Sequence, residues 1–296
     1  MNSAASVRAR LLNLSKQTGE DFQALLNRYA IERFLYRLGA SDQSDDFVLK
    51  GAMLFVAWQG NLHRPTKDLD LLGFGDATPE AVAERIRAVV SVPADDGILF
   101  DPSSIEAAVI REDAQYEGVR VKLSASLEQA RIRLQVDIGF GDVVDPAPAH
   151  TEYPVILKHV EPPMLRMYPP EAVIAEKLQA MVVLDIRNSR MKDFYDLWYL
   201  ARTWSFQLAV LRRAVFATFE RRRTAVPNGV PFALKEEFLA DDGKRQQWLA
   251  FVRRLNLPAE TPELPQIGHE IARFVHPVFA AGNEDGTWQP GGPWHR

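Results

Sequence analysis

The chain begins with apolar side chains at the spacing of helices. Leucine, phenylalanine and tyrosine recur every three or four positions over residues 6–38, with an interruption at Gly19. This pattern predicts two helices, the second ending at Gly39, because glycine readily adopts the left-handed conformation just beyond a helix. A third helix is predicted to begin after Gly51 and to end at Gly60.

From residue 69 the hydrophobic period changes from that of a helix to that of a strand. Apolar and polar residues alternate in four segments, which are Leu69–Leu72, Ile105–Arg111, Val119–Leu127 and Arg131–Phe140. Between the first two, Pro79–Val90 has helical spacing, and a further short strand is predicted over Tyr153–Leu157. A sheet combined with helices indicates an α+β fold.

The second half of the chain has mainly helical spacing. The predicted helices cover Glu171–Val183, Lys192–Ala201, Leu208–Arg222, Leu234–Leu239, Lys244–Leu255 and Ile267–Ala281. A length of 296 residues suits two domains. We therefore expect an α+β domain over residues 1–160, in which N-terminal helices flank a mixed sheet. A mainly helical domain over residues 161–296 is expected to complete the site.

Composition narrows the possible chemistry. The sequence contains no cysteine, which excludes disulfides, thiolate metal sites and cysteine nucleophiles. It has no apolar run of about 18 residues. Its first residues also lack the pattern of a secretory signal, so we expect a cytoplasmic protein without a membrane partner.

The charge balance bears on nucleic-acid binding. With 35 basic and 39 acidic residues the net charge is −4, which excludes a uniformly basic protein but leaves room for a basic patch. Basic clusters in the helical half are Arg212-Arg213, Arg221-Arg222-Arg223, Lys244-Arg245 and Arg253-Arg254. With Phe219 and Trp248 nearby for stacking, these clusters could follow a nucleic-acid backbone. Solvated helix faces are an equally good interpretation.

Two aspartates stand two positions apart in a predicted strand. Because side chains alternate across a strand, Asp68 and Asp70 share one face and the leucines beside them share the other. Two carboxylates on a rigid face suit Mg²⁺, although an acidic pair on a solvated strand is the simpler alternative. In a nearby strand the apolar residues face one way and Asp137 the other. Three acids on a sheet, after a helix begun by glycine, form the set that phosphoryl or nucleotidyl transfer needs.

These motifs resemble a known family. Gly51-Ala52 followed by Asp68-Leu69-Asp70 resembles the Gly-[Gly/Ser] and Asp-x-Asp signature of the DNA polymerase β-like nucleotidyltransferases. A longer series resembles the AbiEii/AbiGii toxin family and consists of Leu49–Phe55, Arg64–Thr66, Asp68–Asp70, Val136–Asp142, Ala175–Ala180 and Arg190–Leu197. One departure is that Ala52 and Met53 stand where glycine, serine or threonine is frequent, so a hydroxyl contact to phosphate is missing.

The resemblance implies a nucleotidyltransferase-type sheet and a set of site residues. Asp68, Asp70 and Asp137 would be metal ligands and catalytic residues, Asp137 alternatively being the base that accepts a proton from the acceptor. Lys177 would lie on the triphosphate, with Asp193 as a supporting catalytic residue. The remaining nucleotide-binding residues would be Lys50, Gly51, Ala52, Arg64, Lys192 and Asp196. Taken singly, a lysine or an acid on a helix is more simply explained as a solvated side chain.

The implied activity is that of a Mg²⁺-dependent enzyme, or one using Mn²⁺, that moves NMP from an NTP to a hydroxyl and releases pyrophosphate. The resemblance further implies the toxin of an abortive-infection toxin–antitoxin system, acting on tRNA 3′ ends and partnered by an antitoxin encoded nearby. One alternative is a degenerate fold that binds nucleotide or a partner without turnover. Another is a nucleotidyltransferase whose acceptor is a protein or a small molecule.

Overall fold

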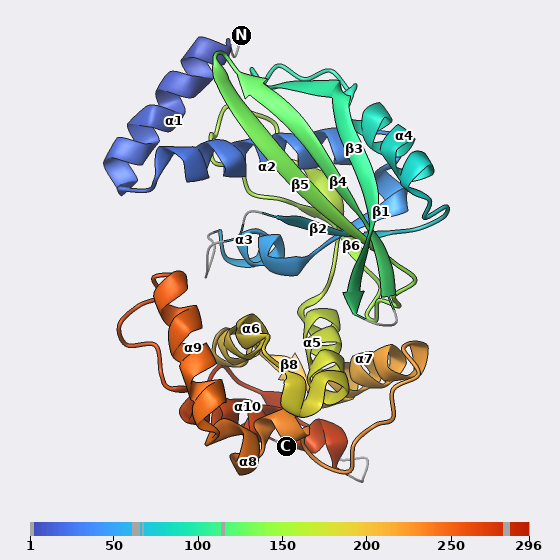
Figure 1. The fold of residues 1–296 in the computed structure, drawn as a ribbon, viewed down its shortest axis with the longest axis vertical. Coiled ribbons are helices and arrows are strands. Elements are labelled where there is room, and N and C mark those ends of the chain that lie inside the picture. Colours follow the sequence, from blue (N-terminus) through green and yellow to red (C-terminus); the bar gives the residue numbers. More distant parts are fainter. Residues whose placement is uncertain (1–2, 61–65, 67, 114–115, 281–284, 296) are drawn as a thin grey trace. The chain divides into compact units, whose positions relative to one another are not determined.

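The protein consists of two compact units, which are described separately. A computed structural model describes residues 3–60, 66, 68–113, 116–280 and 285–295 (Figure 1). Unit 1 contains Met1–Gly141 and Pro148–Tyr168, and unit 2 contains Asp142–Ala147 and Pro169–Arg296. The domain bounds of 1–160 and 161–296 stay a prediction. In the structure, the chain passes from unit 1 to unit 2 at residue 142, returns to unit 1 at residue 148, and enters unit 2 again at residue 169.

Unit 1 combines helices with a seven-stranded mixed sheet, which confirms the predicted α+β class. Its helices are α1 (Ala4–Thr18), α2 (Phe22–Gly39), α3 (Leu54–Gln59) and α4 (Pro79–Val90), with short 3₁₀ turns at Ser44–Asp46 and Gly51–Met53. Its strands are β1 (Phe47–Lys50), β2 (Leu69–Gly73), β3 (Leu99–Asp113), β4 (Tyr116–Leu127), β5 (Ala130–Phe140), β6 (Ala149–Glu152) and β7 (Met164–Met167). The strand order is β3-β4-β5-β2-β1-β7-β6.

Local chemistry explains where the first helices begin and end. The Asp21 side chain accepts a hydrogen bond from the backbone N–H of Ala24 and so caps α2, and Thr78 caps α4 in the same way. Gly19 ends α1 and Gly60 ends α3, both in the left-handed conformation that an L-residue adopts only at a cost. The ends predicted at Gly19 and Gly60 are therefore confirmed, whereas Gly39 is the last residue of α2 and does not adopt the left-handed conformation, and a 3₁₀ turn over Gly51–Met53 precedes α3.

The core of unit 1 lies between the sheet and α2. Alternate residues of β5 point into it, so Ile132, Leu134, Val136 and Ile138 are buried. In Figure 1, α2 passes behind β4 and β5, on the side to which these apolar residues turn. The intervening polar residues of the two strands therefore lie on the opposite face of the sheet.

A buried glutamate ties the segment after β6 to α2. Glu32 Oε2 accepts a hydrogen bond from the backbone N–H of Ile156 at 2.7 Å, and Oε1 accepts one from Arg33 Nη2 at 2.8 Å. Burial, which opposes ionisation, raises the pKa of Glu32 to about 7 despite the stabilising Arg33 charge. The carboxyl group is therefore a point at which pH acts on the stability of this unit.

The strand predicted over Tyr153–Leu157 is wrong. The strand lies earlier, at β6, and Tyr153 follows it outside the sheet. The side chain of Tyr153 is buried, and its backbone N–H donates to Pro163 O. The next residue, Pro154, has no N–H to donate, so a ladder cannot continue through it. The short strands β1 and β7 were not predicted, because four residues are too few to show a period.

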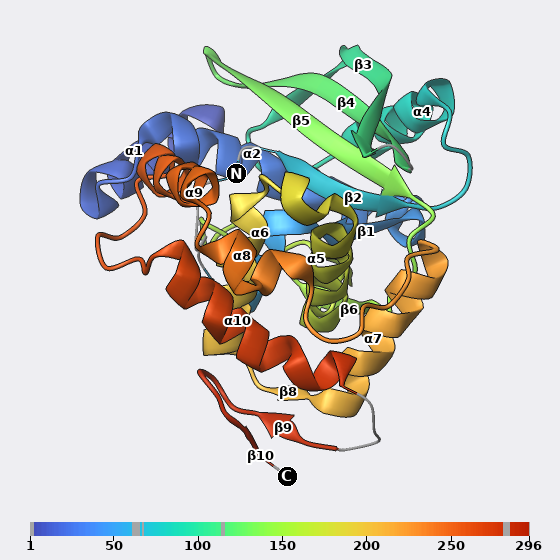
Figure 2. The ribbon, with the colours of Figure 1, turned by 60° about the horizontal axis from the view of Figure 1, so that its bottom comes forward.

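Unit 2 is mainly helical, as predicted (Figure 2). Its elements are α5 (Pro170–Leu184), α6 (Met191–Thr203), β8 (Phe206–Gln207), α7 (Leu208–Arg221), α8 (Glu236–Leu239), α9 (Asp242–Arg254), α10 (Leu264–Phe279), β9 (Thr287–Trp288) and β10 (Trp294–His295), with 3₁₀ turns at Asp185–Arg187 and Phe232–Leu234. Strands β8, β9 and β10 form a small sheet that the sequence did not predict. It is held to α10 by aromatic contacts, since the Phe274 ring lies 4.9 Å from that of Trp288 and 5.9 Å from that of Trp294. Among the described residues, no helix has the length and apolarity needed to cross a membrane.

Candidate functional site

The glycine and the aspartate of the two key motifs are in direct contact. Gly51 follows β1 with φ of +76°, and Asp70 lies in the neighbouring strand β2. A Cβ placed on Gly51 would lie 2.0 Å from Asp70 Oδ2 and 2.8 Å from Asp70 Cβ. Both the backbone conformation and the space therefore require glycine, and the Asp70 carboxylate lies over the start of the helical segment that Gly51 begins.

Four charged residues form a row across the sheet of unit 1. In the strand register Lys50 of β1 is opposite Asp70 of β2, Asp70 is opposite Asp137 of β5, and Asp137 is opposite Arg120 of β4. Residues opposite each other in neighbouring strands place their side chains on the same face. We call Lys50, Asp70, Asp137 and Arg120 the charge row; its cations stand at its two ends and its carboxylates at its centre.

The Lys50 ammonium reaches across the sheet. A Cβ on Gly139 would lie 3.2 Å from Lys50 Nζ, so this ammonium lies over Gly139, two residues beyond Asp137 on the same face of β5. Lys50 therefore shares the face of the acids, as its predicted role in nucleotide binding requires.

At the other end of the charge row, Asp137 is held by an arginine. Arg120 Nε and Nη2 donate to its Oδ1 and Oδ2, each at 2.8 Å, and Gln135 Nε2 donates to Oδ2 at 3.2 Å. The Asp137 side chain is 9% exposed, so this bidentate pair is partly shielded from water. Such a pair fixes the orientation of the carboxylate as well as its charge. Arg120 is not among the residues predicted from the sequence, where its alternating position in β4 is the signal for it.

Asp68 precedes β2 and is exposed, on the same side of the chain as Asp70 by strand alternation. Among the described residues, no group of three or more His, Asp or Glu side chains is arranged to hold a metal ion. Both oxygens of Asp137 accept hydrogen bonds from Arg120, and the other two predicted metal ligands are Asp68 and Asp70, of which Asp70 contacts Gly51. Two carboxylates still fit Mg²⁺, which commonly takes one or two of them together with substrate phosphates.

The remaining predicted residues of this segment differ in exposure. Ala52 and Met53 are 4% and 1% exposed, so their side chains belong to the core and are not available to a ligand. Arg64 lies outside the described residues, and its predicted contact with phosphate stays a prediction.

In unit 2, Lys177 of α5 is paired with two acids of α6. Its Nζ lies 2.7 Å from Asp193 Oδ1 and 2.8 Å from Asp196 Oδ2. The lysine side chain is 15% exposed, and those of the aspartates are 6% and 1% exposed. The two aspartates stand three positions apart on one face of α6, which is why a single ammonium reaches both. The structure thus brings together three predicted site residues that lie on two helices.

Lys192 lines a pocket at the start of α6, also within unit 2. The pocket has a volume of about 470 Å³ and is lined by Ser189, Arg190, Met191, Lys192, Gln247, Ala250, Phe251 and Arg254. Three of these side chains are cations and none is an acid. The α9 residues that line it are spaced along one helical face. The pocket therefore favours an anionic ligand.

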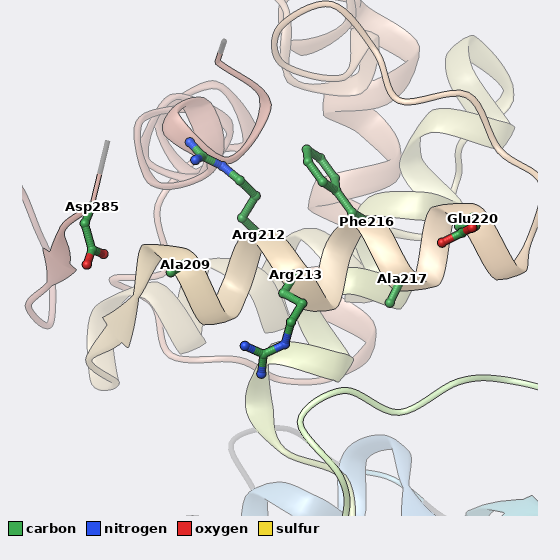
Figure 3. Close-up of a pocket in the computed structure, with 7 residues that line it drawn as sticks. All are labelled: Ala209, Arg212, Arg213, Phe216, Ala217, Glu220 and Asp285. Atoms are coloured by element: carbon green, nitrogen blue, oxygen red, sulfur yellow. The ribbon is translucent and has the colours of Figure 1, made fainter. Parts of the chain in front are cut away.

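The basic clusters of the helical half are mostly used inside unit 2. Arg213 pairs with Asp145 at 2.7 Å, and Arg212 donates to Pro277 O at 2.6 Å. Arg212 and Arg213 are consecutive residues of α7, and Figure 3 shows their side chains pointing away from each other. Both line a pocket of about 580 Å³, as does the exposed Phe216. Arg222 pairs with Asp142 at 2.8 Å.

Another cluster residue and both predicted stacking residues are also engaged or buried. Lys244 is buried and donates to Asn188 O. The proposed stacking residues Phe219 and Trp248 are 0% and 2% exposed, so that part of the prediction is wrong. Arg212, Arg213, Arg222 and Lys244 thus make contacts within unit 2, which neither the nucleic-acid surface nor the solvated helix faces considered from the sequence had anticipated.

Comparisons with known proteins agree with the motifs. The profile of the family described as "Nucleotidyl transferase AbiEii toxin, Type IV TA system" matches residues 33–270. No curated protein matches the chain. The crystal structure of JHP933 from Helicobacter pylori is similar over 87% of this chain and 93% of that chain, with a TM-score of 0.50 and 17% identity.

A second crystal structure from H. pylori, described as a nucleotidyltransferase, covers 88% of this chain and 97% of its own, with a TM-score of 0.51 and 17% identity. At this identity the two structures support the fold alone. The family match covers most of the chain and confirms the resemblance seen in the sequence, together with the predicted class of enzyme. The chain belongs to the AbiEii nucleotidyl transferase toxin family of Type IV toxin–antitoxin systems.

Proposed function

We propose that this protein transfers NMP from an NTP to the 3′ hydroxyl of an RNA, with tRNA as the acceptor, and that it depends on Mg²⁺ or Mn²⁺. The observation that carries the proposal is the contact between Gly51 and Asp70 at the centre of the charge row. A glycine that leaves room for the Asp70 side chain sets this carboxylate, fixed on a strand, beside the turn after β1, and a carboxylate placed so is suited to holding a metal-bound triphosphate.

Asp68 and Asp70 would hold the metal. When bound, a divalent cation neutralises phosphate charge and orients the in-line attack. Since Asp137 already accepts two hydrogen bonds from Arg120, we assign it the role of orienting the acceptor hydroxyl or accepting its proton, rather than that of a third ligand. The Lys50 ammonium would contact the triphosphate from the same face.

The reaction balances without any further reagent. The acceptor oxygen forms a bond to the α-phosphorus of the NTP, and the bond from that phosphorus to the bridging oxygen of the β-phosphate breaks. Pyrophosphate leaves with the bridging oxygen, and the hydroxyl proton passes to a carboxylate, for which we propose Asp137.

Lys177 would meet the charge that accumulates on the leaving pyrophosphate. Its two partners, Asp193 and Asp196, hold the ammonium in one place within unit 2. Lys192 and the cationic pocket around it would bind further phosphate oxygens. A separate antitoxin protein would act as the partner, and we expect the enzyme to work in the cytoplasm.

The test is transfer of label from each α-labelled NTP to bulk tRNA, with Mg²⁺ or Mn²⁺ present. Wild type is compared with the variant carrying Asp68→Asn and Asp70→Asn, which keeps side-chain size and removes the proposed metal ligands. We expect label on RNA with wild type only. Equal labelling by both proteins, with every NTP and metal, would refute the proposed transfer.

A second candidate function is favoured by the core positions of Ala52 and Met53, which offer no hydroxyl to a phosphate. It is a module that binds nucleotide without turnover. A rise in Tm with NTP, together with no transfer to RNA, protein or small hydroxyl compounds, would support it. Label on a protein or a small molecule but not on RNA would instead change the acceptor.

A further inference from the structure

We infer that the exposed face of β4 and β5 in unit 1 binds the phosphate backbone of the acceptor RNA. The inference deepens the proposed function and rests on it, since it assumes an RNA acceptor. It assigns RNA binding to residues that neither the motifs nor the family match singled out, and it moves the basic surface from the helical half to the sheet.

Strand alternation separates the two faces of β4 and β5 cleanly. The buried face is apolar, and the other face carries basic residues, hydroxyls and an amide. The members of this exposed face are Arg120, Lys122, Ser124 and Ser126 of β4, and Arg131, Arg133, Gln135 and Asp137 of β5. Lys122, Arg131 and Arg133 are exposed to solvent.

The charge on this face is positive along β5. Its one acid on the two strands, Asp137, is already neutralised by Arg120. Acids of β3 lie beside β4, where Glu106 is opposite Lys122 and Asp101 is opposite Ser124. An anion is therefore directed toward the β5 side, where Arg131 and Arg133 stand, rather than toward the β3 edge.

The spacing suits a repeating anion. Residues two apart on a strand are about 6.6 Å apart, so Arg131 and Arg133 present guanidinium groups at regular steps along one face. Ser124 is opposite Arg133 and Ser126 is opposite Arg131, which places a hydroxyl beside each arginine. Neutral donors beside cations are the usual partners of phosphate oxygens in nucleic-acid complexes.

This surface leads to the charge row. Arg131 lies six residues before Asp137 on the same face of β5, about 20 Å along the strand. A strand of RNA bound along Arg131 and Arg133 would therefore reach the carboxylate proposed to receive the proton of its 3′ hydroxyl. The basic clusters of the helical half are less suited to binding RNA, since several of their arginines are paired with acids within unit 2.

The test measures RNA binding by the full chain in the absence of NTP, using fluorescence anisotropy of 5′-labelled bulk tRNA over a range of salt concentrations. The test variant carries Lys122→Gln, Arg131→Gln and Arg133→Gln. The control variant carries Lys16→Gln, Lys235→Gln and Arg253→Gln, which are also exposed and give the same change in net charge. All changes are on exposed positions, and Tm is measured for each protein to check folding.

We expect the slope of log Kd against log salt to fall by about 2 in the test variant, because each phosphate contact to a single strand contributes about 0.7. Over a fourfold rise in salt, wild type should therefore lose about 20-fold more affinity than the test variant. The variant with only Arg131→Gln and Arg133→Gln should lose about two thirds of that slope change, and the control variant should match wild type.

Equal slopes and affinities for the test variant and wild type would overturn the inference, as would equal losses in the test and control variants. So would a wild type that does not bind tRNA. Because binding is measured without NTP, these outcomes are independent of the transfer assay. If wild type transfers no label to RNA but its tRNA binding shows the expected salt dependence, the proposed chemistry is refuted and the RNA-binding surface is retained.

Discussion

Replacing Gly51 with alanine tests the contact on which the proposed site depends. The added Cβ would lie 2.0 Å from Oδ2, 2.7 Å from Cγ and 2.8 Å from Cβ of Asp70. Rotating the carboxylate relieves only the first two contacts, because the Cβ position is fixed by the strand. The Gly51 turn or β2 must therefore move, and Asp70 moves with it.

The magnitude has two parts. An L-residue in the left-handed region costs about 1–2 kcal/mol, and the reduced freedom of the unfolded chain offsets about 0.4–1 kcal/mol of that. Crowding in a packed region adds about 1–3 kcal/mol. The sum is about 1–5 kcal/mol, and at about 2–4 °C per kcal/mol for a unit of this size Tm should fall by about 2–20 °C.

Gly19→Ala is the matched control. Gly19 has φ of +75°, close to that of Gly51, but a Cβ there would meet nothing within 4 Å. The control should lose only the backbone part, at most about 6 °C in Tm, and keep full transfer activity. Differential scanning fluorimetry and the labelled-NTP assay measure both effects. Equal Tm losses for the two variants, with activity retained in Gly51→Ala, would refute the reasoning.

Three further changes test separate parts of the molecule. Arg120→Lys keeps the charge, but a lysine cannot donate to both oxygens of Asp137 as the guanidinium does. The kcat for transfer should therefore fall about 10- to 100-fold, while NTP should still raise Tm. An unchanged kcat would contradict the role of this pair. Lys177→Met leaves two buried carboxylates without their cation and should cost about 3–5 kcal/mol, seen as a lower Tm that a second change, Asp196→Asn, partly restores. Burial raises the pKa of Glu32 from 4.5 to about 7, so the stability it contributes is full below pH 4.5 and is lost as pH rises through 7. Between pH 5 and pH 8 the Tm of wild type should thus fall relative to that of Glu32→Gln, by the equivalent of about 2–3 kcal/mol, and parallel curves would contradict this.

Much of the fold could be predicted because its signals are local. The helix Pro79–Val90 was predicted to its observed ends, since Thr78 is a capping residue and Pro79 suits the first turn. The long strands β4 and β5 show the alternation of buried and exposed positions over many residues. The same alternation correctly placed Asp70 and Asp137 on the polar side of the sheet.

What the sequence could not predict depends on pairing between distant residues. Nothing near Asp137 in the chain indicates that Arg120 of another strand stands opposite it, because register is settled only when the whole sheet assembles. The same holds for the ion pairs of Lys177, which join α5 to α6. The strands β8, β9 and β10 have two residues each, and only the packing of their tryptophans on Phe274 shows why they form.

The course of the chain between the two units has a consequence for dissecting the protein. Strand β7 pairs in parallel with β1 but comes after the excursion of residues 142–147 into unit 2. A fragment that stops at residue 141 would therefore leave β1 at an open sheet edge, and a fragment that begins at residue 142 would carry β6 and β7 without the sheet to which they belong. Neither unit can be obtained by a single cut. Because β7 pairs with β1, an inhibitor or a protease that displaces β7 would also disturb β1, the strand that leads into Gly51.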